Sequence, residues 1–298
     1  MKGSGAWPAD RETGERAAGE RARRGHVRRA LLAACCLAFA GTAAAPLHGQ
    51  DLGRQVAAVR DGAVGFRYAA APGVFGAGDG VIIIRRDGRT SIMHGSMRGD
   101  LSRFDTASCA CQNGPVRVVL TKQAGKVTRL DVAVGDDWPS SGAVRDLGEV
   151  QPQTAANYLV DLVPDVPRRA ANEAMMAAGL GRDVVLWRRL LPLARDRSLE
   201  SGKRKQVVFW LGQEASDAVL GPLRDLALAD DDDIAVRKSA IFALSQHKGV
   251  DVVPTLMRLA QSDRLDPRLR KQAFFWLAQH PDPEVVDFFE RLLAGNQP

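Results

Sequence analysis

The spacing of hydrophobic and polar positions changes about halfway along the chain. Up to about residue 150, short β-branched runs partly alternate with polar residues, which is typical of half-buried strands. Beyond it, apolar residues recur at spacings of three and four, which is typical of one face of a helix. We therefore expect a multidomain protein with a small β domain at residues 51–150 and an all-α domain at residues 151–298.

The pattern of residues 51–150 predicts about five strands in a mainly antiparallel arrangement. The clearest runs are Gly62–Tyr68, Val81–Ile84, Val116–Leu120 and Lys126–Val134. Gln123-Ala124-Gly125 and Asp87-Gly88 predict hairpin turns. The glycines at 73, 76, 78 and 80 predict a flexible loop, and Asp136–Gly142 predicts a connector that leads to Val150. This half resembles no family that we recognise.

The second part contains an internal repeat with a period of 33 residues. Three segments align without gaps: Arg204–Gln213, Arg237–Gln246 and Arg270–Gln279. A weaker copy lies one period earlier, at Asn172–Leu180, and a second apolar segment with i, i+3 spacing follows each copy. Each unit therefore predicts two antiparallel helices, whose apolar stripes become buried only when neighbouring units stack.

Helix-capping residues support this division. Asp266-Pro267 and Asp282-Pro283 combine an N-cap acid with proline at the first helical position. The run Asp230–Asp233 places negative charge before another helix, where the helix dipole favours it.

The repeat resembles the HEAT family over roughly residues 167–293. The pattern Asp-x-x-Val-Arg, followed by a small and apolar helix and then Leu-x-x-Leu-Ala, is clearest at Asp233–Arg237 and Asp266–Arg270. The first copy has Ala171 in place of the arginine, which is typical of a capping repeat. The resemblance implies a right-handed solenoid of about four two-helix repeats, with the repeat arginines paired to acids of adjacent repeats. It also implies a scaffold for protein partners in most cases and an enzyme in a minority.

Several polar and aromatic residues recur at the repeat period. Lys205, Lys238 and Lys271 form a ladder that either binds an acidic partner or is a solvated outer face; the near-neutral mature chain favours the solvated face. Glutamines at 213, 246 and 279 are expected to satisfy loop backbone groups. Trp210 and Trp276 either line a groove or pack between helices, and we favour packing.

The second helix of each repeat is expected to line the concave face, where solenoids bind their partners. Equivalent positions on that face share no charge or chemistry from repeat to repeat. The polar candidates for partner binding there are Arg224, Asp225, Arg258 and Arg291.

The distribution of charge and the N-terminal sequence indicate where in the cell the protein is found. Of the net charge of +6, +4 lies in the first 30 residues, which leaves +2 from Asp51 onward and gives no electrostatic reason to expect nucleic acid. Arg28-Arg29, the apolar run Ala30–Ala40 and Ala43-Ala44-Ala45 predict a secretory signal within residues 1–50. The apolar run is shorter than the roughly 20 residues of a membrane span. We predict a periplasmic or extracellular protein without a span after cleavage near Ala45 or Gln50; lipidation at Cys35 and an uncleaved anchor are the alternatives.

Two cysteines remain in the predicted mature chain, in Cys109-Ala110-Cys111. They predict a strained local disulfide or a pair of loop thiols, with a redox or metal role as the alternative. No further metal ligands stand at zinc spacing beside them.

No catalytic motif is present in the sequence. It has no Gly-x-Ser-x-Gly and no His-Glu pair, the pair through which HEAT-type di-iron hydroxylases bind metal. We expect a non-enzymatic module that binds a protein or peptide and needs no cofactor. The alternatives are an accessory enzyme related to lyase-type HEAT proteins, or a thiol-based redox or metal sensor at Cys109 and Cys111.

Overall fold

The computed structural model describes residues 49–295 except 79, 87–88, 95–110, 141, 215, 231, 248 and 250. The predicted signal region up to residue 48, with Cys35, lies outside the described residues, and so does Cys109. Residues Ala45–Pro298 form one compact unit. The division of this unit into two domains at residue 150 stays a prediction.

A four-stranded sheet is built around the first predicted strand, β1 (Gly62–Tyr68). Its order is β6-β5-β1-β7, in which β5 spans Val116–Gln123, β6 Lys126–Val134 and β7 Val144–Glu149. β1 pairs antiparallel with β5 and parallel with β7. The strand β7 is missing from the sequence prediction, which ran a connector through to Val150. The turn predicted between β5 and β6 is confirmed, and Ala124 and Gly125 both have positive φ there.

A second, three-stranded sheet has the order β2-β3-β4. Its strands are β2 (Val74–Gly76), β3 (Val81–Arg86) and β4 (Arg89–His94), all antiparallel. The turn predicted at Asp87-Gly88 lies outside the described residues, between the paired strands β3 and β4. The glycine-rich segment is not simply a flexible loop, because it contains β2. A Cβ on Gly76 would lie 1.8 Å from the carbonyl oxygen of Val134 on β6, so only glycine fits this contact.

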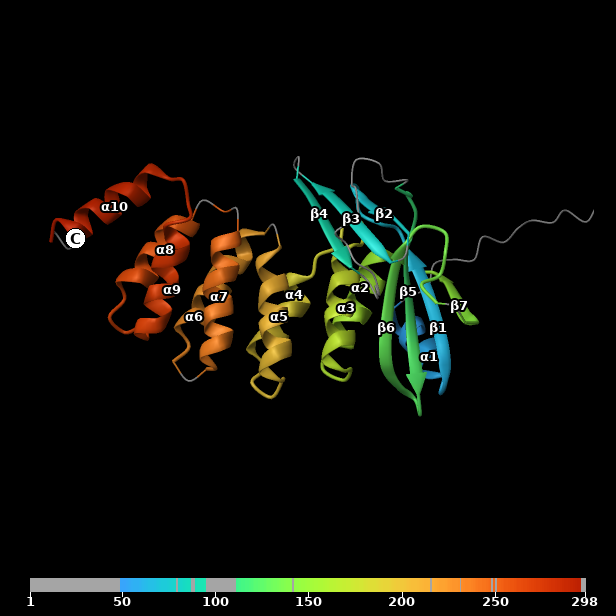
Figure 1. Ribbon diagram of the computed structural model, residues 1–298. Coiled ribbons are helices and arrows are strands. Elements are labelled where there is room, and N and C mark those ends of the chain that lie inside the picture. Colours follow the sequence, from blue (N-terminus) through green and yellow to red (C-terminus); the bar gives the residue numbers. More distant parts are fainter. Residues whose placement is uncertain are drawn as a thin grey trace, which may run out of the picture. The chain divides into compact units, whose positions relative to one another are not determined.

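Three helices cover one face of the four-stranded sheet: α1 (Gly49–Ala57), α2 (Pro152–Asp161) and α3 (Arg168–Gly179). The alternation of apolar residues along β1 and β5 points Phe66, Tyr68 and Val118 into this shared core. In the core the Tyr68 hydroxyl donates a 2.5 Å hydrogen bond to the Ala177 carbonyl of α3. The sheet is thereby tied to the first helix of the repeat region (Figure 1).

Tyr68→Phe tests this tie. We expect the free energy of unfolding to fall by about 1 kcal/mol, since one buried hydrogen bond is lost while the ring stays packed. Urea unfolding of the two proteins measures the difference. Tyr158→Phe is the matched control, because the Tyr158 hydroxyl makes no hydrogen bond within the described residues. Equal losses in both variants would contradict the prediction.

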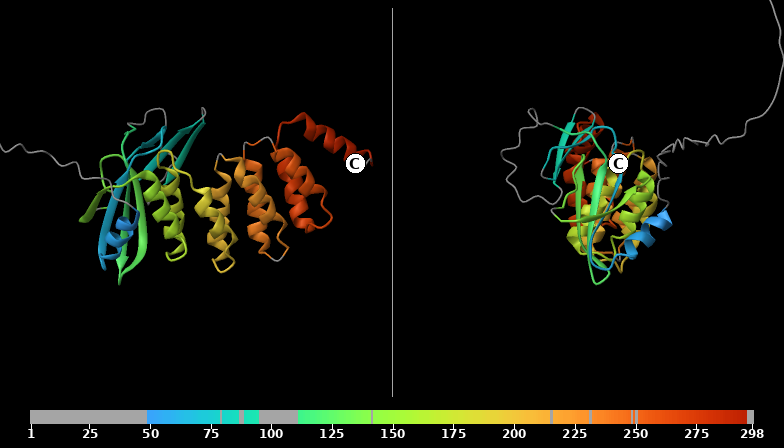
Figure 2. Two further views of the ribbon diagram at one scale, coloured as in Figure 1. Left: turned by 180° about the vertical axis from the view of Figure 1, so that it is seen from behind. Right: turned by 90° about the vertical axis from the view of Figure 1, so that its right-hand side faces the viewer.

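The predicted helix pairs are confirmed along the rest of the chain. The first helices are α3, α5 (Ser201–Gly212), α7 (Ile234–Gln246) and α9 (Pro267–Leu277). The second helices are α4 (Trp187–Arg195), α6 (Leu220–Leu228), α8 (Val252–Gln261) and α10 (Pro283–Leu293). In both opposed views α5, α7 and α9 lie side by side (Figure 1, Figure 2), and the chain approaches closely between α5 and α7 and between α7 and α9.

The predicted caps are also confirmed. The carboxylates of Asp233, Asp266 and Asp282 accept hydrogen bonds from backbone N–H groups in the first turns of α7, α9 and α10. Each satisfies a donor that a helix start leaves without an intrahelical partner. Over the described residues, no helix is both long and apolar enough to cross a bilayer.

The repeat arginines hold successive helices together. Arg204 of α5 donates two hydrogen bonds to the Ala194 carbonyl near the end of α4 and two to the Asp232 carboxylate before α7. One repeat later, Arg237 bonds the Ala227 carbonyl and Asp230. The expected pairing with repeat acids is confirmed, and at Arg204 it links α4, α5 and the loop before α7.

Candidate partner-binding surface

An aromatic row crosses the first helices of three successive repeats. Trp210 and then Phe209 on α5 lead to Phe242 on α7 and on to Trp276 and Phe275 on α9. The ring centroids of consecutive members lie 5.7, 6.2, 4.9 and 4.9 Å apart. Phe209 is 37% exposed and Phe275 is 55% exposed, while the other three rings are partly buried. The row is therefore continuous across the repeats and exposed at Phe209 and Phe275.

The period of 33 residues fixes this row. It brings each phenylalanine to the same turn of its helix, while the buried positions of the same turn hold the helix against its neighbours. At the close of α5, a Cβ on Gly212 would lie 2.6 Å from the Ala243 Cβ of α7, so the two helices approach as closely as glycine permits. This close approach places Phe209 and Phe242 in a stack with an interplanar angle of 8°.

Trp210 and Trp276 pack between helices as predicted, and both also belong to the aromatic row. Each is only partly buried and packs against the core, as expected. Each also extends the aromatic row, since Trp276 contacts both Phe242 and Phe275. The Trp276 indole N–H is buried and has no hydrogen-bond partner within the described residues.

Lysines and glutamines flank the aromatic row at each of the three repeats that it crosses. A lysine stands four residues before each phenylalanine, on the same face of the first helix, and a glutamine follows four residues after it. Only Gln246 lies within its helix, because Gln213 and Gln279 come after the last residues of α5 and α9. We name these nine residues the Lys–Phe–Gln surface: Lys205, Phe209 and Gln213; Lys238, Phe242 and Gln246; Lys271, Phe275 and Gln279.

The glutamine prediction is wrong. The side chains of Gln213, Gln246 and Gln279 are exposed, and none bonds a loop backbone group in the described part of the chain. The Gln246 amide donates instead to the Ser245 hydroxyl. The amides of Gln213 and Gln279 thus make no hydrogen bond within the described residues, while that of Gln246 bonds its neighbour on the same helix.

The polar residues predicted for partner binding lie on the second helices. Arg224 and Asp225 are neighbours on α6 and form a half-exposed ion pair with a 3.0 Å separation. Arg258 of α8 donates to the Thr255 hydroxyl of the same helix, and Arg291 is exposed on α10. Across the described residues, no hydrogen bond or ion pair of these four side chains joins one of the three helices to another. Their role in binding stays a prediction.

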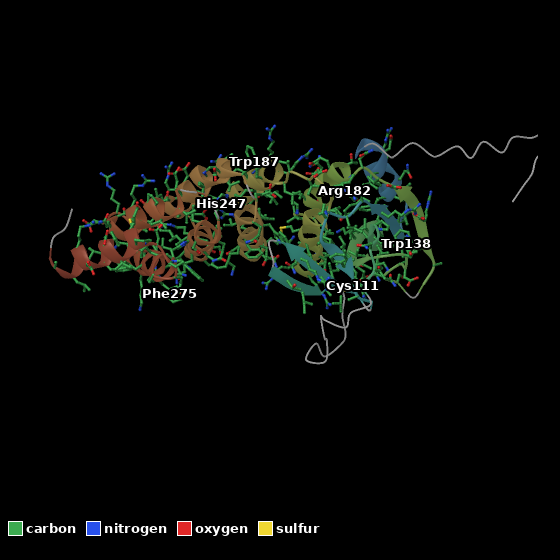
Figure 3. The ribbon with its side chains drawn as sticks, turned by 90° about the horizontal axis from the view of Figure 1, so that it is seen from above. Cys111, Trp138, Arg182, Trp187, His247 and Phe275 are labelled. Carbon is green, nitrogen blue, oxygen red and sulfur yellow. The ribbon has the colours of Figure 1, made fainter. Side chains whose placement is uncertain are left out.

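Trp187 and His247 lie on the other side of the helical part from Phe275 (Figure 3). There the Glu214 carboxylate accepts hydrogen bonds from the backbone N–H groups of Leu186 and Trp187 at the start of α4. Burial raises the pKa of Glu214. His247 stands one period after Glu214, and its Nδ1 accepts a hydrogen bond from the Gly249 N–H. The Glu214 and His247 side chains thus accept hydrogen bonds from backbone N–H groups of nearby loops and helix starts.

The β part has a cavity of about 580 Å³ beside β6. Its lining includes Arg129, Asp131 and Trp138. Arg129 pairs with the nearly buried Asp131 carboxylate, and the Arg117 guanidinium lies 4.8 Å from the Trp138 ring centroid. Arg129 and Asp131 are thus paired with each other, whereas Asp137, which also lines the cavity, is exposed and takes part in no ion pair among the described residues.

Cys111 forms a disulfide. Its pairing with Cys109 stays a prediction, because Cys109 lies outside the described residues. Among residues that the structure describes, no three histidine, cysteine or acidic side chains come together as a metal site.

Tandem helix pairs with a sequence period of 33 define a helical repeat protein. The family model for HEAT repeats matches residues 188–268, from α4 to the start of α9. The chain is therefore a HEAT repeat-containing protein. No curated protein matches it. The extension of the HEAT resemblance to residues 167–187 and 269–293 rests on the repeat period and on the helices found there.

Proposed function

We propose that this chain is an exported, non-enzymatic scaffold that binds a protein or peptide. HEAT repeats generally mediate protein interactions and typically belong to scaffolds rather than enzymes. We propose further that the helix pairs form a right-handed solenoid of about four repeats, the arrangement typical of this family. Stacked repeats of that kind create an extended surface on which a partner can lie.

The observation that carries the proposal is the exposed aromatic row. Exposed apolar patches on soluble proteins mark interaction sites, and aromatic residues are enriched at the centres of interfaces. Phe209 and Phe275 keep a large exposed area although many buried positions exist in the same helices. We therefore place the binding surface on the first helices, and the residues predicted on the second helices are the competing surface.

We also propose export to the periplasm or the extracellular space, with cleavage near Ala45. The order of basic, apolar and small residues before Ala45 supports a secretory signal. Of the two predicted cleavage positions, Gln50 lies within α1, whose Leu52 and Val56 are buried in the core. Cleavage near Ala45 leaves this helix whole.

Capture of a partner from an envelope extract tests the binding surface. We expect Phe209→Ser/Phe275→Ser to lose at least nine-tenths of a captured partner, because both exposed anchors of the row are removed. Val286→Ser is the matched control, since Val286 is an exposed apolar residue on α10 at 58% exposure. Retention in the double serine variant together with loss in Arg224→Glu/Arg258→Glu would move the site to the second helices.

A further inference from the structure

We infer that the cavity beside β6 binds a neutral saccharide, with the Trp138 ring against one face of the sugar. The cavity shares no residue with the aromatic row on which the proposed function rests. Its volume of about 580 Å³ lies within the range of roughly 300–1,000 Å³ that is usual for small-ligand sites. The basis of the inference is a fixed aromatic ring beside hydrogen-bonding groups that the fold leaves unused.

Trp138, labelled in Figure 3, is held in place by β1 and by one guanidinium group. A Cβ on Gly65 of β1 would lie 2.6 Å from a carbon of the indole ring, so the ring lies directly against the strand at a position without a side chain. The Arg117 guanidinium of β5 lies 4.8 Å from the ring centroid, and its Nε donates a 2.8 Å hydrogen bond to the Gly135 carbonyl. The ring is therefore fixed before a ligand arrives, which lowers the entropic cost of binding.

The strand register brings polar side chains of the lining to the same face of the sheet as this ring. Gly65 pairs with Val119 of β5, and Val119 pairs with Asp131 of β6. Thr121 pairs directly with Arg129, two residues away on the same two strands. Directly paired residues share a face of a sheet, and so do residues two apart on one strand. The indole ring, the Thr121 hydroxyl and the Arg129–Asp131 pair therefore lie on one face.

Several hydrogen-bonding groups of the lining have no partner within the described residues. The Thr121 hydroxyl and the Gln112 side-chain amide can each donate and accept, and the exposed Asp137 carboxylate accepts. Arg129 binds the Asp131 carboxylate through Nε, at 2.9 and 2.8 Å from the two oxygens, which leaves its terminal nitrogens as donors. The cavity thus offers donors and acceptors together, the combination that suits the hydroxyl groups of a sugar.

The charges around the cavity favour a neutral ligand. Arg129 and Asp131 neutralise each other, and Asp137 has no ion pair among the described residues. An anion in the cavity would face the Asp137 carboxylate, while a cation would face the Arg117 guanidinium that already lies against the indole ring. A sugar ring avoids both, because it is uncharged, buries apolar C–H groups against an aromatic face and presents hydroxyls at its edge.

An array of immobilised oligosaccharides tests the inference on the purified full chain. The array holds uncharged oligosaccharides, oligosaccharides of uronic acids and oligosaccharides of unacetylated amino sugars, matched in length. We expect binding to uncharged members, with at least tenfold weaker binding to the acidic and the cationic ones. Absence of binding to every uncharged member, or equal binding to charged and uncharged members, would overturn the inference.

Variants of the lining give the second arm, by titration calorimetry with the uncharged oligosaccharide that binds best. Trp138→Ala is expected to weaken binding at least tenfold. Thr121→Val keeps the shape of the side chain and is expected to weaken binding about two- to tenfold, through the loss of one hydrogen bond. Phe209→Ser/Phe275→Ser, on the Lys–Phe–Gln surface, is the control, with an unchanged dissociation constant.

Urea unfolding of each variant separates loss of binding from loss of the fold. If Trp138→Ala does not fold, Thr121→Val and Asp137→Ala decide the outcome, and unchanged dissociation constants in both would overturn the inference. Loss of saccharide binding in the serine variant would also overturn it, by moving the site to the first helices. If no saccharide binds while the serine variant still loses the envelope partner, the inference fails and the proposed function stands.

Discussion

Arg204→Met is expected to lower the free energy of unfolding by about 3–5 kcal/mol, the usual cost of removing one partner from a buried ion pair. The side chains of Arg204 and Asp232 are each 4% exposed. Without the guanidinium, the Asp232 carboxylate stays in the protein interior without its partner and the Ala194 carbonyl loses its two donors. Urea unfolding measures the loss. A lower midpoint with an unchanged dependence of the unfolding free energy on urea concentration shows that stability has fallen.

Arg270→Met is the matched control for that experiment. Arg270 occupies the same repeat position, but its partner Asp263 is 97% exposed. Exposed pairs contribute about 0–1 kcal/mol, so the control is expected to lose no more than that. A second variant, Arg204→Met/Asp232→Leu, removes both charges and should recover much of the loss. Equal losses at Arg204 and Arg270 would show that burial of the pair does not determine its contribution.

The helical half was largely predictable because its signals repeat. A period of 33 with aligned apolar positions determines the helix pairs, and Asp followed by Pro determines where α9 and α10 begin. The sequence predicted that the repeat arginines pair with acidic residues, but not which acid each arginine contacts. Four consecutive aspartates precede α7. The sequence does not distinguish Asp232, whose side chain is buried against Arg204, from Asp230, which is exposed although its partner Arg237 is buried.

The β half was less predictable because its missing elements depend on distant contacts. β7 has the sequence Val-Arg-Asp-Leu-Gly-Glu, without alternation, and it becomes a strand by pairing with β1 about 80 residues earlier. The tie between Tyr68 and Ala177 spans 109 residues. No local sequence pattern indicates contacts between residues so far apart in the chain. The strand β1 was predicted because the alternation in its own sequence reflects burial of one face.

The binding surface was predicted on the second helices, and the exposed aromatic row was missed. The phenylalanines are visible at the repeat period, yet an apolar residue on a repeat helix is normally assigned to the core. Only the packing of α5 against α7 reveals that Phe209 and Phe242 stack on the outer side of their helices. The signal that could have found them is the lysine four residues before each phenylalanine, since a charged residue and its i+4 neighbour share one face.

A fall in stability with rising pH is expected from Glu173, which lies on α3 and is 7% exposed. Burial raises its pKa from an ordinary value of 4.5 to about 7; Arg169, one turn earlier, opposes this rise, and Asp131 of β6 adds to it. One carboxylate oxygen has no hydrogen-bond partner within the described residues. Asp131 is itself paired with Arg129. Among the described ion pairs, none places a cation in direct contact with the Glu173 carboxylate.

The direction of the pH dependence follows from proton uptake. Between pH 4.5 and 7 the folded protein holds a proton on Glu173 that the unfolded chain has released, so stability decreases across this interval and is constant above it. A change in pKa of this size corresponds to about 3 kcal/mol. Glu173→Gln should therefore match the unchanged protein near pH 4.5 and exceed it by about 3 kcal/mol at pH 8, measured by urea unfolding. Glu290→Gln, at an exposed position on α10, controls for the loss of one negative charge. A constant difference between Glu173→Gln and the unchanged protein at both pH values would show that Glu173 is ionised in the folded state throughout, with its burial compensated by Arg169.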